Sequence, residues 1–333
     1  MGASFSQAFP PRPVFTEKNL PDLTGKVYVI TGPTSGIGLQ LSALLYSKNA
    51  TVFLAARSRP KLETAVEKIK SLHPLSKGLL YPLDLDLGSY DSIKAGASEF
   101  LSKSQRLDVL FHNAGVLAPP KGSENSHGVE LQMGVHCLGP YLLTYLLEET
   151  LKNTARLPDV GIGEARVVWV GSSGAMLTPK GGVDVEELRN GKFHDHPPTT
   201  RYCISKAGEY FLSGKFNRIL RVHGILSVYL DPGNIKTDLQ RTFSTEVSWI
   251  GSFILNMFLH KAIQGAYTEL FAGLSTDLNL ETLKDIDTWV IPFGRLGTVR
   301  PDLVSACRTA VDEQSGNVVE FFAWCDEQLN GYL

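Results

Sequence analysis

The sequence predicts an α/β fold of the doubly wound type, in which a mainly seven-stranded parallel sheet carries helices on both faces. Two observations predict this fold. Short apolar runs alternate with amphipathic segments along most of the chain, as strands alternate with helices around a parallel sheet. The runs are apolar at nearly every position, which is typical of strands covered on both faces.

The first half of the chain begins with an arm and continues with strands and helices in turn. Residues 1–24 contain Pro10, Pro11, Pro13 and Pro21, which prevent a regular helix or a central strand. Strands are expected over residues 26–31 (KVYVIT), 51–56 (TVFLAA), 78–83 and 107–111, where β-branched and apolar residues follow one another. Helices are expected over residues 36–49, 60–72, 89–102 and 128–151, where apolar residues recur at helical spacing.

The second half continues the alternation but is interrupted twice. Further strands are expected over residues 165–170, 224–230 and 288–291, and a helix over residues 202–222. Residues 174–201 are rich in turn signals and are expected to form a loop, and residues 238–274 read as a helical insertion with an apolar first half. We therefore expect one domain over residues 25–333, after an arm over residues 1–24.

The composition of the 333-residue chain excludes several classes of protein. Hydrophobic residues make up 43% and charged residues 20%, which excludes a disordered or collagen-like chain. The net charge of −2 gives no overall basic excess for binding nucleic acid. Four cysteines without CxxC or CxH spacing argue against a disulfide scaffold or a structural zinc site. No apolar run reaches the roughly 18 residues of a membrane span, so we expect a cytoplasmic protein, with peripheral membrane contact left open.

A glycine-rich turn, TGPTSGIG over residues 31–38, follows the first strand and opens the first helix. In such a turn, typical of Rossmann folds, backbone N–H groups and the helix dipole face a phosphate. Gly32 permits the tight turn, Gly36 leaves space for a pyrophosphate, and Gly38 lets helix and strand pack closely. The predicted phosphate-binding residues are Gly32, Thr34, Ser35, Gly36, Ile37 and Gly38. The alternative is a tight turn that binds no ligand.

The end of the second strand indicates which dinucleotide binds. An acidic residue at this place binds the ribose hydroxyls of NAD and repels a 2′-phosphate. The chain has Arg57 and Ser58 there instead, and they can pair with a phosphate and donate a hydrogen bond to it. The sequence therefore favours NADP(H). The alternative is that Arg57 and Arg59 are solvated surface residues.

Tyr202 and Lys206 lie four residues apart at the start of a predicted helix, so they share one helix face. The pKa of a free Tyr is about 10, and a nearby ammonium lowers it. Such a Tyr can give a proton to a carbonyl oxygen or take one from an alcohol. Ser172, just after the strand over residues 165–170, can hold the reacting oxygen beside Tyr202. The alternatives are a surface pair on a helix and a serine that caps the next segment.

Four strings occur in the order in which the short-chain dehydrogenase/reductase family has its motifs. They are TGPTSGIG, HNAG over residues 112–115, YCISK over residues 202–206 and DPGNIKT over residues 231–237. The chain resembles this family from residue 25 to about residue 300. The FTEKNLPDLTGK and VIPFGR segments make it similar to fungal retinol-dehydrogenase-like members.

The resemblance implies a role for each matched residue. Ser172 would orient the substrate oxygen, Tyr202 would donate or accept the proton, and Lys206 would lower the pKa of Tyr202 and bind the nicotinamide ribose. Asp86 would contact adenine, with Asp84 as its rival. Further contacts with the cofactor are expected from Asn113, Ala114, Gly115, Pro232, Gly233, Ile235 and Thr237. The resemblance also implies a possible homodimer through the helices over residues 128–151 and 202–222.

His136 departs from the family pattern, because the family usually has Asn at this place in the long helix. The family Asn acts largely through its backbone carbonyl, which His136 keeps. His136 is therefore a candidate catalytic residue. Catalysis could be unchanged, altered in its pH dependence or weakened, and a buried neutral histidine is the structural alternative.

The substrate is expected to be bulky and apolar. Trp249, Phe253 and Met257 share one helix face in the insertion over residues 238–274, which the family uses as a lid over the nicotinamide. Met176, which follows the Ser172 segment, is a further candidate substrate contact. The same apolar face could instead pack in the core, in a dimer interface or on a membrane.

The sequence thus predicts an NADP(H)-dependent oxidoreductase that reduces a ketone or aldehyde of a bulky, apolar, secondary-metabolite-like substrate, or oxidises the matching alcohol. Alternatives are a catalytically weak cofactor-binding or scaffold protein and a reductase that also assists a cyclisation. No metal is expected, because His194 and His196 have no third ligand nearby in the sequence.

Overall fold

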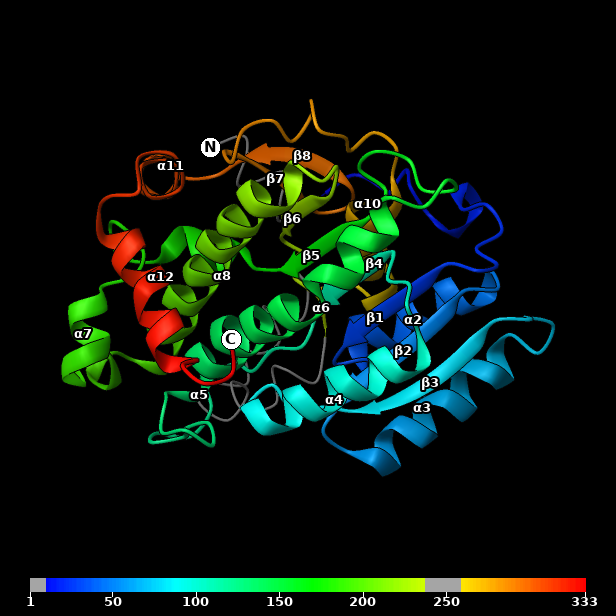
Figure 1. Ribbon diagram of the computed structural model, residues 1–333, viewed down its shortest axis with the longest axis horizontal. Helices are drawn as coiled ribbons and strands as arrows, with labels where there is room; N and C mark the ends of the chain where they lie inside the picture. Colours follow the sequence, from blue (N-terminus) through cyan, green and yellow to red (C-terminus); the bar gives the residue numbers. More distant parts are fainter. Residues whose placement is uncertain (1–9, 237–258) are drawn as a thin grey trace.

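The computed structural model describes residues 10–236 and 259–333, and its centre is one eight-stranded sheet (Figure 1). The strands are β1 (Val27–Thr31), β2 (Thr51–Ala56), β3 (Leu79–Asp84), β4 (Val109–His112), β5 (Arg166–Val170), β6 (Leu226–Leu230), β7 (Thr288–Ile291) and β8 (Arg295–Thr298). Their order is β3-β2-β1-β4-β5-β6-β7-β8, and every neighbouring pair is parallel except β7–β8. The predicted fold class is confirmed.

The sequence predicted seven strands, whereas the described residues form eight. The additional strand is the edge strand β8. This strand reads RLGT, and its side chains are alternately half-buried and exposed, so it lacks the apolar run that marks the other strands. It pairs antiparallel with β7 through a tight connection at Gly294, whose φ is 80°. An edge strand with one open side does not need an apolar sequence.

Helices cover both faces of the sheet. They are α2 (Gly36–Ser47), α3 (Arg59–Leu72), α4 (Tyr90–Lys103), α5 (Leu131–Met133), α6 (Gly139–Ala155), α7 (Val185–Asn190), α8 (Pro198–Arg221), α10 (Ala262–Leu274), α11 (Pro301–Arg308) and α12 (Asn317–Gln328). Alternate residues of β1 enter two separate apolar cores: Tyr28 and Ile30 pack with α2, α3 and α10, whereas Val27 and Val29 pack with α4, α6 and α8. Figure 1 shows α4, α6 and α8 in front of the sheet.

Two predicted segments differ in detail from the structure. The long helix begins at Leu131 rather than at residue 128, and a π-helical turn, Gly134–Leu138, joins α5 to α6. The stretch expected to be a loop contains α7 and two short 3₁₀ turns, and α8 begins at Pro198 because Pro is favourable in a first helical turn.

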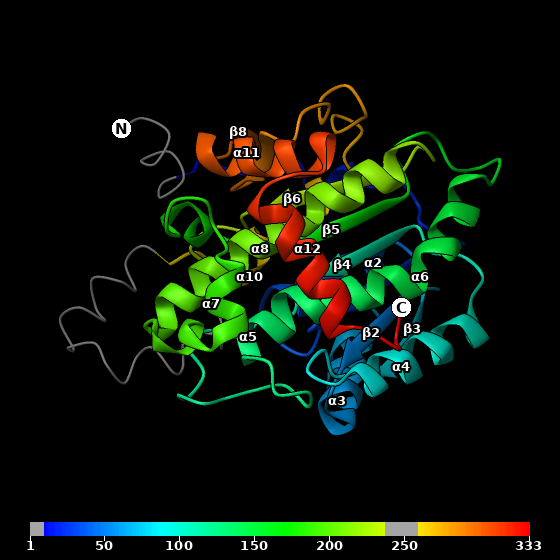
Figure 2. The ribbon, with the colours of Figure 1, turned by 60° about the vertical axis from the view of Figure 1, so that its left-hand side comes forward.

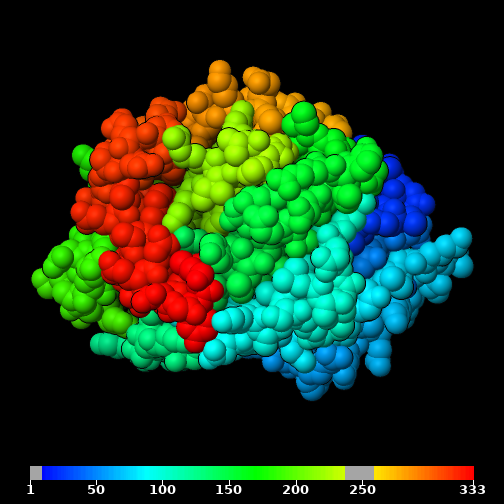
Figure 3. Space-filling view, viewed as in Figure 1, coloured from blue at the N-terminus to red at the C-terminus, as the bar shows by residue number. Residues whose placement is uncertain are grey.

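The C-terminal helix α12 lies across α8 and α6 (Figure 2). Phe321 of α12 approaches Gly208 of α8, where an added Cβ would lie 3.0 Å from its ring. The Asp326 carboxylate accepts a hydrogen bond from Tyr141 of α6 and pairs with Lys215 of α8 at 3.3 Å. The space-filling view shows the red C-terminal segment on the outer surface, beside α8 and α6 (Figure 3).

Helix α10 packs on the other face and holds the described part of the arm. The rings of Phe15 and Phe271 are 5.9 Å apart, and the Tyr267 hydroxyl donates to Glu17 at 2.7 Å. α10 packs against α2, β5 and β6, and the extent of the predicted lid over residues 238–274 stays a prediction. The division into an arm and one domain stays a prediction.

Several predicted residues lie outside the described part of the chain. They are Thr237 of the DPGNIKT motif and the lid residues Trp249, Phe253 and Met257.

Among residues 10–236 and 259–333, no helix has the length and apolar character needed to cross a membrane. The same residues contain no cluster of three side chains suited to a metal ion. His196 contacts a carboxylate instead, with its Nε2 2.7 Å from Oε2 of Glu187.

Candidate active site

The glycine-rich turn after β1 is shaped by two close approaches. Gly32 and Gly36 have φ of 69° and 55°, a left-handed conformation that favours glycine. An added Cβ at Gly38 would collide with the Asn113 side chain and with the Gly32 carbonyl. Ser35 precedes α2 without a side-chain capping bond, so the first N–H groups of the helix are not capped by that side chain. The turn therefore has the shape and the N–H groups of a phosphate cradle.

The end of β4 is fastened to this turn. The Asn113 amide donates to the carbonyls of Thr31 at 2.8 Å and Gly32 at 3.1 Å. The Ala114 N–H donates to the Thr31 hydroxyl at 3.0 Å. The HNAG motif thus holds two strand ends together where a dinucleotide would cross the sheet.

The arginines after β2 differ in their partners. Arg59 pairs with Glu63 at 3.1 Å and with Asp84 at 3.4 Å. Arg57 is exposed and, within the described residues, forms no ion pair. Ser58 precedes α3 without a side-chain capping bond. Arg57 and Ser58 therefore keep their donors for a ligand, whereas Arg59 is engaged.

The two aspartates considered for adenine are both hydrogen-bonded or paired. Asp84 binds Arg59, as described above. The Asp86 carboxylate accepts from the Gly88 N–H at 2.9 Å, and its own N–H donates to Ser92 Oγ. Asp86 therefore shapes the turn into α4, and its contact with adenine stays a prediction.

Ser172, Tyr202 and Lys206 come together at the carboxyl end of β5. An added Cβ at Gly174 would lie 3.2 Å from both Ser172 Oγ and the Tyr202 ring, so both side chains border one point. Ser172 Oγ also accepts from the Gly174 N–H at 3.0 Å, which is the capping role considered as its alternative. Lys206 Nζ is 6.0 Å from the centroid of the Tyr202 ring.

Burial and neighbouring groups act in opposite directions on the pKa of Tyr202. Burial of the hydroxyl raises its pKa, while Lys206 and the Ser172 hydroxyl lower it. Glu209 and Asp231 add smaller upward contributions, and the net direction is upward. Lys206 thus lowers this pKa in the expected direction, but its contribution does not offset the desolvation of the hydroxyl.

His136 is buried in the π-helical turn and is part of a hydrogen-bonded chain. Its Nε2 accepts from the Val116 N–H at 3.0 Å, so the proton resides on Nδ1. Nδ1 is 2.8 Å from Ser205 Oγ, and Ser205 donates in turn to the Tyr202 carbonyl at 2.8 Å. Burial lowers the pKa of His136 well below its ordinary value, and Lys206 lowers it further. The ring is therefore neutral and connects α5–α6 to the start of α8.

The DPGNIKT segment follows β6 as expected. The Gly233 N–H donates to the Asp231 carboxylate at 3.1 Å, and Gly233 has a φ of 94°. Ile235 is buried and pairs with His260 across an isolated β-bridge. Pro232, Gly233 and Ile235 thus lie at the same sheet edge as Ser172, and their contacts with a cofactor stay predictions.

Sequence reasoning missed residues that hold this site from behind. Glu209 binds Lys206, with 2.7 Å between Oε2 and Nζ. The Tyr229 hydroxyl donates to the Lys206 carbonyl at 2.9 Å. Arg300 donates to the Met176 carbonyl at 2.9 Å and fixes the turn after Ser172. Only Glu209 had a signal in the sequence, since a carboxylate three residues after the lysine lies on the same helix face.

Comparisons with known proteins agree with this geometry. Residues 26–179 match the family model described as short chain dehydrogenase. A short-chain dehydrogenase/reductase of Phomopsis amygdali is 42% identical over 99% of this chain and 97% of its own length. Another, from Neocamarosporium betae, is 36% identical over 100% of this chain and 94% of its own length. The chain belongs to the short-chain dehydrogenase/reductase family.

A solved structure from Mycobacterium paratuberculosis has the same fold as this short-chain dehydrogenase/reductase. The TM-score is 0.65 at 23% identity, and the match covers 94% of this chain and 97% of the other. The protein is thus an oxidoreductase by family, as its motifs indicated.

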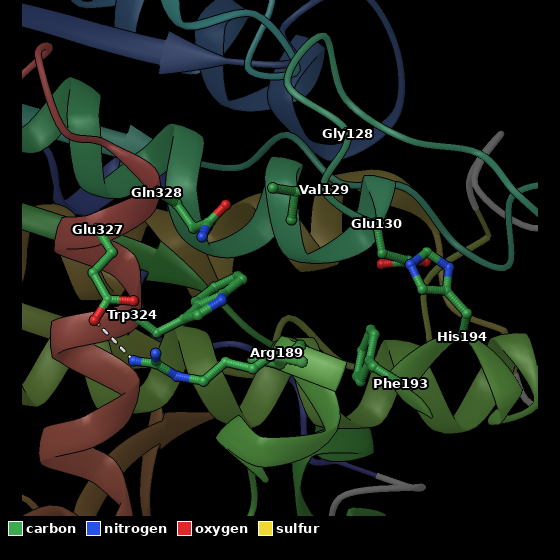
Figure 4. A pocket seen from close by; sticks show the side chains of 10 residues that line it. Gly128, Val129, Glu130, Arg189, Phe193, His194, Trp324, Glu327 and Gln328 are labelled. Carbon is green, nitrogen blue, oxygen red and sulfur yellow. Dashed lines mark hydrogen bonds and ion pairs between the residues drawn. The ribbon is translucent and has the colours of Figure 1, made fainter. Parts of the chain in front are cut away.

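The short-chain dehydrogenase/reductase also has a pocket of about 420 Å³ between α12, α7 and the segment before α5 (Figure 4). Val129 and Glu130 before α5, Arg189 and Phe193 near α7, and Trp324 of α12 are among its lining residues. None of the predicted site residues lines it. In Figure 4, Arg189 is joined to Glu327 across one side of the pocket, at 2.8 Å. The pocket is therefore separate from the space bordered by Ser172 and Tyr202.

Proposed function

We propose that the protein is an NADP(H)-dependent carbonyl reductase, which reduces a ketone or aldehyde or oxidises the matching alcohol. The observation that carries this proposal is the convergence of Ser172 Oγ and the Tyr202 ring on one point, with Lys206 one turn along the same helix. Such an arrangement suits the transfer of a proton to or from a substrate oxygen.

The residues present fit a nicotinamide dinucleotide. The cradle of Gly32, Gly36 and Gly38 accommodates a pyrophosphate at the start of α2, and the sheet edge beyond it leads to Tyr202. When bound, the nicotinamide ring supplies the hydride. Tyr202 gives its proton to the carbonyl oxygen, and Ser172 holds that oxygen by a hydrogen bond. A cationic ring and the Lys206 ammonium both favour the phenolate, which counteracts the effect of burial on Tyr202.

The preference for NADP(H) is supported by Arg57 at the end of β2, which is exposed and forms no ion pair with any residue that the structure describes, while Arg59 is engaged. A guanidinium at this place binds a 2′-phosphate through a charge-assisted fork. The chain has no Asp or Glu at that position, so no carboxylate there repels the 2′-phosphate.

A bulky and apolar substrate is supported by the sequence of the lid, in which Trp249, Phe253 and Met257 recur at helical spacing. Half-buried Met176 adds an apolar side chain to the turn that follows Ser172. The proposal also includes a secondary metabolite as the substrate and the cytoplasm as the location of the protein.

The test replaces the phenol of Tyr202. We expect Tyr202→Phe to lose nearly all reduction of a panel of ketones and aldehydes, followed at the nicotinamide absorbance, while NADPH binding persists. Tyr145→Phe, at an exposed tyrosine of α6, is the matched control and should keep full turnover. Full turnover in Tyr202→Phe would overturn the proposal. Silence of the unmodified protein despite NADPH binding would favour a scaffold protein.

A further inference from the structure

A carboxyl group that none of the motifs explains lies beside Lys206. Glu209 is almost one turn further along α8, and its Oε2 is 2.7 Å from Lys206 Nζ. The two side chains are only 3% and 5% exposed. The pair is therefore shielded from water, and each charge depends on the other rather than on solvent.

The ammonium of Lys206 has three N–H donors, and the fold uses two of them. One binds the Val170 carbonyl at 2.8 Å, at the end of β5, and one binds Glu209. The remaining N–H is available to a ligand or a water in the neighbourhood of the Tyr202 ring. Two fixed contacts leave the ammonium little freedom to turn away.

Three other ionisable groups around the pair are neutral side chains. Burial raises the pKa of Cys137, in the π-helical turn, and of Tyr229, on β6, well above their ordinary values. Burial lowers the pKa of His136, as described above. Asp231, a further buried carboxyl group that acts on Tyr202, forms no ion pair with Lys206. Among the described residues, Glu209 is thus the carboxyl group paired with this ammonium. Burial raises the pKa of Glu209 to about 7 although Lys206 lowers it, so the group carries its charge above that pH.

Two opposing effects decide the charge of Lys206. Burial by itself lowers the pKa of an ammonium, whereas the carboxylate of Glu209 raises it, with smaller upward contributions from Tyr202 and Cys137. The net direction is upward. Removal of the Glu209 charge would therefore take away the main effect that raises the pKa of Lys206, and burial would then lower this pKa.

We propose that Glu209 is a positioning residue of the active site, which keeps the buried Lys206 amine protonated and fixed beside Tyr202 before any coenzyme binds. This inference rests on the proposed function, because Lys206 matters for catalysis through Tyr202. A direct effect of Glu209 on Tyr202 is weaker, since Coulomb energy falls with distance and Glu209 touches Lys206 but not Tyr202.

The test measures the charge of Lys206 without turnover. Lysine labelled at Cε is titrated by carbon NMR in the full chain, with and without NADP⁺, and Lys206→Met assigns the signal. We expect Glu209→Gln, an isosteric neutral change, to lower the Lys206 midpoint by about two pH units. Glu269→Gln is the matched control: Glu269 is fully buried on α10, and its carboxylate oxygens bind nothing among the described residues. It should leave the midpoint unchanged.

Kinetics give a second readout. In Glu209→Gln, kcat should fall at pH values above the lowered Lys206 midpoint, while the KM for the carbonyl substrate stays nearly constant. Glu209→Asp, which keeps the charge, should restore much of the profile.

An unchanged Lys206 midpoint in folded Glu209→Gln, or an equal shift in Glu269→Gln, would overturn the inference. If the amide variant fails to fold, Glu209→Met provides a second neutral side chain of similar volume, with the same expected shift. Failure of both variants to fold would assign the pair to stability and overturn the inference as well. Turnover by Tyr202→Phe would instead contradict the proposed function. In that case the titration of Lys206 would still decide whether Glu209 keeps the amine protonated.

Discussion

A single ring, that of His136, replaces an amide that the family usually has and connects three backbone segments. The sequence left open whether this histidine titrates, weakens catalysis or is structural. Contacts with the Val116 N–H and Ser205 Oγ now fix its tautomer and explain its neutrality. Such contacts depend on the π-helical turn, Gly134–Leu138, which hydrophobic spacing does not indicate.

His136 should make stability depend on pH. Its pKa is lowered in the folded state, so the unfolded chain binds more protons, and stability falls as pH drops below about 6.5. We expect His136→Asn to lower the unfolding free energy by about 1–3 kcal/mol at about pH 8. The difference from the unmodified protein should narrow at about pH 5, where the histidine itself costs stability. Urea denaturation at both pH values measures this, and a constant difference would contradict it.

Arg57 should determine the choice of coenzyme. Loss of a charge-assisted contact with a phosphate costs about 1.5–3 kcal/mol, so Arg57→Asp should weaken NADPH binding about 10- to 150-fold and leave NADH binding less affected. Arg59→Asp is the control, because Arg59 is already engaged with Glu63 and Asp84. Fluorescence titration gives both dissociation constants. Equal affinities of the unmodified protein for NADPH and NADH would show that Arg57 does not bind the phosphate.

At the scale of elements, the sequence predicted the strands and helices whose residues follow a clear hydrophobic pattern. The strand β2 and the edge of the parallel sheet, β7, begin and end where apolar runs do. Short or polar elements were missed: β8 has an open side, and α7 has too few residues for a helical period. Motif residues at strand ends were found, because topology alone brings them together. The Arg300–Met176 contact was not found, because it depends on packing between elements, and the Glu209–Lys206 contact was missed although its spacing of three residues is a signal in the sequence.

The connection from β8 to α11 should control the binding of substrate. Arg300 donates to the carbonyls of Met176 at 2.9 Å and Thr178 at 2.7 Å, and thereby fixes the turn after Ser172. We expect Arg300→Ala to raise the KM for large apolar ketones about tenfold, with NADPH affinity unchanged. Arg308→Ala, on the exposed side of α11, is the control. Unaltered KM in a folded Arg300→Ala protein would show that this turn needs no such support.

At the scale of the molecule, α12 covers part of the helix face through which the family resemblance suggested a dimer. The inner side of α12 is buried in the core through Phe321, Trp324 and Cys325. Asp326 of the same helix binds Tyr141 and Lys215 of the two long helices. Pairing of two copies through α6 and α8 would have to displace or accommodate α12 on the part of the face that it covers.

We therefore expect a monomer at micromolar concentration, measured by size-exclusion chromatography with light scattering. Phe321→Asp buries a charge under α12 and should loosen it, with association and a lower melting temperature as the result. Exposed Glu320→Asp on the same helix is the control. A stable dimer of the unmodified protein joined through α6 and α8 would contradict this expectation.

The position of α12 also has a consequence for biosynthesis. Of the described elements, α12 is the last to leave the ribosome, whereas the α8 face that it covers is translated about a hundred residues earlier. At a synthesis rate of about 5–20 residues per second, that face waits for several seconds without its cover. Apolar surface exposed during this interval is open to aggregation, so nascent chains should depend on chaperones more than the finished enzyme does. Ribosome-bound chains that stop before residue 317 should therefore bind a holdase, and chains that include α12 should release it.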